Sequence, residues 1–216
     1  MNKKGVLTVV SGFSGAGKGT LMKALLEKYE YGLSISATTR APRDGELNGR
    51  EYFFLSKEQF EEMIAKKELI EWAKYVDNYY GTPKAYVEEQ LSVGKNVILE
   101  IEIQGALNVK EMFPDALLIF VTPPTAKELK ERLIGRGTED IATIEKRLTR
   151  ALEESKFMEQ YDYIAINDVL EDCVEEMNNI INEKSCCLQE QRQLENSVDY
   201  STLINRIQSE LEELQK

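Results

Sequence analysis

The chain has 216 residues, a formal net charge of −11 and no histidine. This length allows one domain with a sizeable hydrophobic core. The acidic balance disfavours nucleic acid as the main partner, because surfaces that bind nucleic acid are basic. Without histidine, the chain cannot form a Ser–His or Cys–His nucleophile pair and lacks the commonest general base.

The cysteines and the apolar segments indicate a cellular compartment. Cys173, Cys186 and Cys187 lack the spacing of a metal site or a disulfide framework, so they are typical of reduced thiols. No apolar stretch approaches the length of a membrane span. Met1 to Lys4 run directly into the first predicted strand, which leaves no room for a signal peptide. We therefore expect a cytoplasmic protein with no membrane partner.

The first predicted elements are a buried strand over Val6–Val10 and a helix over Lys18–Glu30, joined by a glycine-rich loop. Glycines let successive backbone N–H groups turn toward an anion, and the helix N-terminus adds its positive dipole end. A lysine at the start of the helix supplies a mobile cation for the outer phosphates. The pattern predicts a nucleoside triphosphate site formed by Ser14, Gly15, Ala16, Gly17, Lys18, Gly19 and Thr20.

One position departs from the usual pattern G-x-x-x-x-G-K-[ST]. Gly19 stands where a hydroxyl residue normally follows the lysine, and Thr20 comes one residue later. That hydroxyl normally ligates Mg²⁺. The departure therefore leaves the protein's contact with the metal open, whereas the phosphate cradle is complete.

Further strands and helices alternate along the chain. Apolar runs predict strands, and amphipathic patterns between them predict helices, which together favour a doubly wound α/β fold with a parallel sheet flanked by helices. The strands are Asn96–Ile101, Leu117–Val121 and Tyr163–Ile166, and the helices are Pro83–Val93, Leu107–Met112 and Asp168–Glu183. Ligands of such sheets bind beyond the carboxyl ends of the strands. Glu100 and Glu102 are therefore expected at a site.

Two segments differ from this core in composition. Residues 35–85 are rich in Thr, Arg, Tyr, Gly and Asn and predict a small β-rich lobe. Residues 125–156 are highly charged, mostly helical in pattern and carry several arginines, which predicts a mobile lid. The core domain then comprises residues 1–34, 86–124 and 157–184, and residues 185–216 form a separate tail.

The tail has the pattern of an amphipathic helix. Leu203, Ile207, Leu211 and Leu214 recur at helical spacing among Glu, Gln and Lys. The stripe is short for a self-sufficient coiled coil. Packing on the body, pairing with a second copy of the chain and fraying stay open, and packing or weak self-association is favoured over a partner-binding role.

Several linked motifs occur in one order along the chain. After the glycine loop they are Ser36-Ala37-Thr38-Thr39-Arg40-Ala41-Pro42-Arg43, Gly45 to Tyr52, Phe60 to Trp72, Asn78-Tyr79-Tyr80-Gly81-Thr82, Glu100 to Gly105, Pro123-Pro124, and Arg132 to Thr138. Together they resemble guanylate kinase from residue 5 to about residue 184. The tail lies outside this resemblance.

The resemblance implies an acceptor-phosphate site in the β-rich lobe. Arg40 and Arg43 lie three residues apart on an Ala-Pro turn, so their forked donors can converge on one phosphate dianion. Tyr52 and Tyr80 can add hydroxyl donors. In guanylate kinases, the residues that match these four hold the phosphate of GMP.

The resemblance also implies a guanine-reading site. A carboxylate accepts both the N1–H and the N2–H₂ donors of guanine, whereas adenine would leave that carboxylate unpaired. Glu71 matches the guanine-reading carboxylate of the family, Ser36 its helper hydroxyl, and Thr82 a position often occupied by Ser. Glu102 matches an acidic residue near the base, although some members have Asp there and at the position of Glu100.

The implied reaction is ATP + GMP = ADP + GDP. The acceptor is an anionic phosphate oxygen, so no general base is needed, and positioning and charge stabilisation dominate. Lys18 is expected to hold the donor β- and γ-phosphates, and Arg136 and Asn167 to lie near the donor adenine. Mg²⁺ would lie near Thr20 and Glu100. The lid residues expected to close over the transferring group are Arg132, Arg136 and Arg147.

Two alternatives remain at this point. The loop Gly15 to Thr20 also resembles that of adenylate kinase, but this reading leaves Glu71 and the Tyr79-Tyr80 segment unexplained. A guanylate-kinase-like protein-binding module without catalysis would generally lack an intact phosphate cradle. The expected partners are ATP/ADP and GMP/GDP, with dGMP not distinguished from GMP and self-association left open.

Overall fold

The main sheet of the computed structural model has five parallel strands, and the structure describes residues 5–75, 77–135, 140–189 and 199–215. Strands buried on both faces form as continuous apolar runs, as in the fully buried run Leu117–Val121. Across the sheet the order is β2 (Gly32–Leu33), β7 (Val97–Glu100), β1 (Leu7–Gly12), β8 (Leu117–Thr122) and β9 (Tyr163–Ile166).

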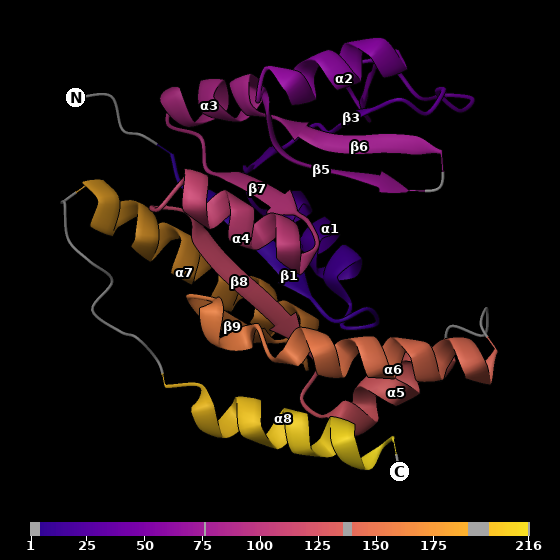
Figure 1. The fold of residues 1–216 in the computed structure, drawn as a ribbon. Helices are drawn as coiled ribbons and strands as arrows, with labels where there is room; N and C mark the ends of the chain where they lie inside the picture. The colour runs from indigo at the N-terminus through magenta and orange to yellow at the C-terminus, as the bar shows by residue number, and fades with distance from the viewer. Residues whose placement is uncertain (1–4, 76, 136–139, 190–198, 216) are drawn as a thin grey trace.

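Helices cover both faces of this sheet (Figure 1). Helix α4 (Ile103–Met112) lies in front of it in the view shown, and α1 (Lys18–Lys28) and α7 (Leu170–Gln189) pack together behind it. Helix α3 (Lys84–Ser92) packs against β7. The predicted α/β class with a parallel sheet is confirmed. The two-residue edge strand β2 was not predicted, and α4 begins at Ile103, four residues before the predicted start.

A second, four-stranded sheet lies at the top of Figure 1. It carries α2 (Lys57–Ala65), whose start is fixed by a reciprocal capping box between Ser56 and Gln59. Its own buried cluster is small, consisting of Ala37, Phe60 and Leu69. Across the sheet the order is β4 (Phe53–Phe54), β3 (Ala37–Thr38), β6 (Asn78–Pro83) and β5 (Leu69–Tyr75).

Two helices, α5 (Ala126–Gly135) and α6 (Ile141–Ser155), follow β8 and are called the lid helices below. The side chain of Asp140 caps α6 by accepting a hydrogen bond from the backbone N–H of Thr143 (2.8 Å). A short 3₁₀ turn, η1 (Met158–Gln160), returns the chain to β9.

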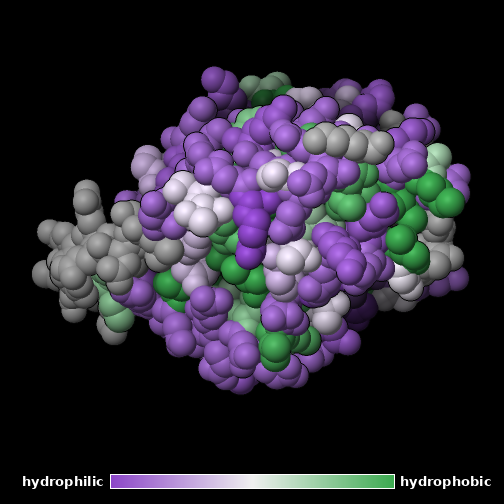
Figure 2. Space-filling model, turned by 90° about the horizontal axis from the view of Figure 1, so that it is seen from below, coloured by the Kyte–Doolittle hydropathy of each residue, from purple (hydrophilic) through white to green (hydrophobic). Residues whose placement is uncertain are grey.

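The last helix, α8 (Ser201–Glu213), packs against both lid helices on their far side from the second sheet (Figure 1). Its buried residues are Ile204, Ile207 and Leu211, whereas Leu203 and Leu214 of the predicted stripe are only partly buried. Its outward face belongs to a mainly hydrophilic surface on which hydrophobic groups are scattered (Figure 2). The tail helix therefore packs on the body of the same chain.

The sequence predicts that no apolar stretch is long enough to span a membrane. Within the described ranges, no helix combines the length and the apolar composition that crossing a bilayer requires.

Candidate active site

The glycine-rich loop joins β1 to α1 through two backbone conformations that suit glycine. Gly12 has φ 150° and Gly17 has φ 86°. A Cβ at position 12 would lie 2.1 Å from the carbonyl oxygen of Val121, and one at position 17 would lie 2.5 Å from Nδ2 of Asn167. Both glycines therefore allow a close approach that a side chain would prevent. Gly17 directly precedes α1, so the loop ends at a helix N-terminus.

Lys18 folds back over the start of the loop. Its Nζ donates to the carbonyl oxygens of Gly12 (2.6 Å) and Phe13 (3.1 Å). Lys18 and Gly12 line a cavity of about 160 Å³ together with Glu100, Ile101 and Glu102. The structure thus brings the loop lysine and both predicted carboxylates to the carboxyl end of β7.

The lid helices deliver two of the predicted arginines to this loop. Arg132 of α5 donates from Nη1 to the carbonyl oxygen of Ala16 (3.3 Å) and from Nη2 to that of Asn167 (2.7 Å). Arg147 of α6 donates to the hydroxyl of Ser14. Arg136, the third predicted lid arginine, lies outside the described residues.

Asn167, predicted near the donor adenine, is buried (6% exposed) against the loop. Its Nδ2 donates to the carbonyl oxygen of Ala16 (2.8 Å). Thr20 is exposed in the first turn of α1. Gly19 precedes it, and a Cβ at Gly19 would meet nothing within 4 Å. The missing hydroxyl therefore has no steric explanation in the described residues.

Arg40, two residues after β3, is held within an aromatic cluster beside the second sheet. Its guanidinium lies 5.5 Å from the ring centroid of Tyr52, and the rings of Tyr52 and Tyr80 meet edge to face at 6.1 Å. Nη2 of Arg40 donates to Glu46 (2.9 Å), whose other oxygen accepts from the backbone N–H of Arg43 (2.7 Å). These contacts lower the pKa of Glu46, with the Arg40 bond as the largest cause. Arg40, Tyr52 and Tyr80 therefore share one site.

Glu71 lies on β5 beside β6 and is half-buried. The hydroxyl of Thr82, itself buried, donates to its Oε1 (2.7 Å). Burial raises the pKa of Glu71 above its ordinary value, and the Thr82 bond opposes this only in part. Ser36 lies just before β3, where its carbonyl oxygen accepts from the backbone N–H of Phe53 (2.9 Å).

Glu102 is turned toward the lid. It forms the N-cap residue of α4, and its Oε2 accepts from Nη2 of Arg150 on α6 (2.7 Å). Arg150 also donates from Nε to Glu154 (2.8 Å). In this arrangement, the carboxylate predicted beside guanine links the core to the lid.

Three residues without a predicted role hold the predicted ones in place. Glu46 orients Arg40, Arg150 pairs with Glu102, and Glu128 accepts from Nε of Arg132 (3.0 Å). Only the last pair has a sequence signal, because a carboxylate four residues before an arginine faces it on a helix. The other two pairs depend on how the elements meet in space.

The carboxylates of Glu100 and Glu102, near Lys18, are the groups that could contact a divalent cation. Burial raises the pKa of Glu100, Lys18 opposes the shift, and the neighbouring charge of Glu102 adds to it. A divalent cation would relieve both penalties on the carboxylates. Across the described part of the chain, no group of three or more His, Cys, Asp or Glu side chains forms a metal cluster.

Comparisons with known proteins all point to one family. A family model described as guanylate kinase matches residues 4–184. A guanylate kinase of Clostridioides difficile is 54% identical over 180 residues, which cover 83% of this chain and 88% of the relative. One of Halalkalibacterium halodurans is 52% identical over 186 residues, covering 85% and 91%.

A solved structure extends this similarity to the fold. The crystal structure of guanylate kinase from Anaplasma phagocytophilum superposes with a TM-score of 0.64 at 32% identity, covering 85% of this chain and 87% of that one. The family match ends at residue 184, before α8.

Proposed function

The chain belongs to the guanylate kinase family, and from that premise we propose which of its residues carry out the reaction. It is an ATP-dependent nucleoside monophosphate kinase that catalyses ATP + GMP = ADP + GDP. Phosphoryl transfer asks the protein mainly for positioning and charge stabilisation. These tasks fall to three groups of residues: those at the acceptor, those at the donor and those of the lid.

One observation on strand β6 supports the acceptor site. Tyr80 and Thr82 lie two residues apart, so they point to the same face of the strand. Tyr80 belongs to the Arg40 cluster, and Thr82 donates to Glu71 (2.7 Å). Two residues of one strand, about 7 Å apart along the backbone, thus connect to a cationic site and to a carboxylate, as recognition of the phosphate and the base of one nucleotide requires.

We assign the GMP phosphate to Arg40, Arg43, Tyr52 and Tyr80. Glu71 would accept from guanine N1–H and N2–H₂, and the hydroxyl of Thr82 would hold it in place. Ser36 and Glu102 would complete the base site. In that role Glu102 would exchange its bond with Arg150 for one with the base.

The donor phosphates are assigned to the loop from Ser14 to Thr20 and to Lys18. Lys18 would exchange its two carbonyl partners for phosphate oxygens. Arg132 and Arg147, which reach the loop from α5 and α6, would stabilise the charge on the transferring group. Arg136 would also stabilise the charge on the transferring group. Asn167 would affect donor binding indirectly, because its bond to Ala16 holds the phosphate-binding loop in place.

We also propose which residues would hold the metal ion. Thr20 and Glu100 would hold Mg²⁺ together with the donor phosphates and water, and when bound the ion would neutralise charge on those phosphates. We propose a cytoplasmic location, supported by the free thiols of Cys173, Cys186 and Cys187.

The decisive experiment measures ADP release from ATP and Mg²⁺ with GMP, AMP, CMP or UMP as acceptor. We expect turnover with GMP, and its loss in Arg43→Ala and in Glu71→Gln. Arg50→Ala is the matched control, because Arg50 is a largely exposed arginine of the same lobe that pairs with Glu51. Equal turnover with AMP, or full activity in both variants, would refute the acceptor assignment.

A further inference from the structure

Helix α6 has two faces with different neighbours. Ile144, Leu148 and Ala151 recur at helical spacing and are buried. Arg147 flanks this buried stripe and Arg150 lies further round the helix, and they contact Ser14 and Glu102. Because α8 packs on α6, the helix lies between the nucleotide site and α8 (Figure 1).

Helix α8 also bonds to both ends of the lid. At the entry, Glu210 accepts from the backbone N–H of Ala126 (2.8 Å), and Arg206 donates to the carbonyl oxygen of Pro124 (3.0 Å). At the exit, Gln208 donates to the carbonyl oxygen of Ser155 (3.2 Å). One helix thus holds the two points where the chain enters and leaves the lid.

The contact at Ala126 completes the start of α5. Thr125 accepts from the backbone N–H of Glu128 (3.1 Å), and Glu210 satisfies the N–H of Ala126, another donor without a partner inside the helix. A carboxylate at a helix N-terminus is also favoured by the helix dipole. The tail therefore supplies part of the cap of the helix that carries Arg132.

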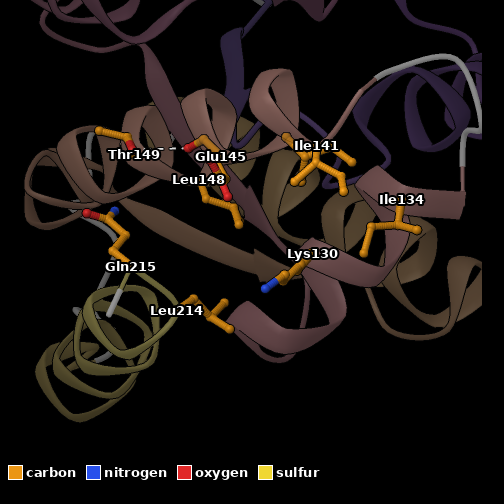
Figure 3. Close-up of a pocket in the computed structure, with 9 residues that line it drawn as sticks. Lys130, Ile134, Ile141, Glu145, Leu148, Thr149, Leu214 and Gln215 are labelled. Carbon is orange, nitrogen blue, oxygen red and sulfur yellow. Dashed lines mark hydrogen bonds between the residues drawn. The ribbon is translucent and has the colours of Figure 1, made fainter.

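The other end of α8 is anchored to the core, since the ring of Tyr200 meets that of Tyr163 on β9 edge to face at 5.8 Å. The packing loosens beyond Leu211, where a cavity of about 460 Å³ separates Leu214 from Lys130 and Leu148 (Figure 3). The hydrogen bonds of α8 to the lid therefore lie where the chain enters it, at Pro124 and Ala126, and where it leaves it, at Ser155. These two points are called the hinges of the lid below.

We propose that α8 is a positioning element for phosphoryl transfer, in which Glu210 and Gln208 fix the hinges of the lid so that Arg132 and Arg147 meet the donor phosphates. This rests on the proposed roles of those arginines. Glu210 and Gln208 touch no reacting group in this scheme and act only through α5 and α6. Misplacing a catalytic group by about 1 Å costs up to about 10²-fold in rate.

The test uses the full-length chain with Glu210→Ala and Gln208→Ala combined. Ser209→Ala with Glu212→Ala is the matched control, because both residues are exposed on the same helix. We expect kcat to fall about tenfold, while the Kd of GMP measured without ATP stays within twofold. Glu210→Gln, which keeps an acceptor oxygen, should retain more activity than Glu210→Ala, and the control should match the unmodified chain.

Two outcomes would overturn the proposal. An unchanged kcat in the double variant would show that the hinge bonds do not position the lid. A parallel loss of GMP affinity and kcat would show that the hinge bonds only stabilise the fold. The variant Arg147→Ala tests the role of Arg147 separately from the role of α8. Full activity of Arg147→Ala would refute the role of Arg147. An inactive Arg147→Ala together with a fully active double variant would refute only the role of α8.

Discussion

At the scale of single residues, the recognition role proposed for Glu71 implies a cost to stability. Its carboxylate has one strong donor in Thr82, and burial raises its pKa. Two guanine donors would satisfy two further lone pairs, whereas adenine would leave them unpaired. An unpaired buried polar group discriminates by up to about 10⁴- to 10⁵-fold. The charge proposed to read guanine is therefore expected to destabilise the substrate-free protein.

Glu71→Gln should separate these two effects. The amide presents a donor toward guanine N–H groups, so kcat/KM for GMP should fall by at least about 10²-fold. The free energy of unfolding at pH 7 should rise, because a buried charge is removed. Steady-state kinetics and urea unfolding measure the two quantities. Glu68→Gln, at an exposed position in the same lobe, should change neither; a less stable Glu71→Gln would contradict the argument.

The pH dependence of GMP binding follows from the same group. Because the folded pKa of Glu71 is raised, lowering the pH protonates it earlier than an ordinary glutamate. The KM for GMP should therefore rise as the pH falls through that pKa, while this group's contribution to stability becomes more favourable. KM measured between about pH 5 and pH 8 tests this. The same rise in Glu71→Gln would assign the titration to another group.

At the scale of elements, the loop and the first turn of α1 tolerate change at one position and not at another. Gly17 has φ 86° and lies against Asn167, whereas Gly19 is helical and a Cβ there would be in open space. Glycine inside a helix costs about 0.5–1 kcal/mol relative to better helix formers. Nothing in the described surroundings requires glycine at position 19.

Gly19→Ser should therefore raise the free energy of unfolding by about 0.5 kcal/mol and keep the kinase active. The added hydroxyl stands at the usual metal-ligating position, so the Mg²⁺ concentration for half-maximal activity should fall. Thermal unfolding and a Mg²⁺ titration of the rate measure these effects. Gly17→Ser is the control and should lose activity; a similar loss in Gly19→Ser would show that the space is needed for nucleotide.

The elements differ in how far the sequence predicts them. The strands around Val9 and Leu118 follow from continuous apolar runs, and Lys18 follows from its spacing to the glycines. The start of α4 was placed too late, because Glu102 and Ile103 give no separate N-cap signal. The pairs Glu46–Arg40, Glu102–Arg150 and Glu210–Ala126 join segments without a common period, so only the folded structure identifies them.

At the scale of the whole molecule, the acceptor and donor residues lie on separate elements. Glu71 lies on β5 of the second sheet and Arg40 just after β3, Lys18 begins α1 next to the main sheet, and Arg147 lies on α6 of the lid. Transfer requires these groups to converge on one pair of nucleotides and to exclude water. The second sheet and the lid helices are therefore both expected to move toward the main sheet when both substrates are present.

Small-angle scattering tests this movement. The radius of gyration should decrease when a bisubstrate analogue is bound, because the second sheet and the lid helices both close over it. GMP alone should give a smaller decrease. An unchanged scattering curve with saturating analogue would contradict closure of either part.

The small cluster of Ala37, Phe60 and Leu69 has a consequence for the lifetime of the protein. A lobe with so few buried contacts opens at a lower free energy than the main core. A ligand at 100 times its Kd adds about 2.7 kcal/mol to the state that binds it. GMP is then a stabiliser as well as a substrate: limited proteolysis should cleave first between residues 35 and 85, and GMP should suppress that cleavage. Starved of acceptor, the enzyme would become easier to degrade, which couples its abundance to the supply of the nucleotide it phosphorylates.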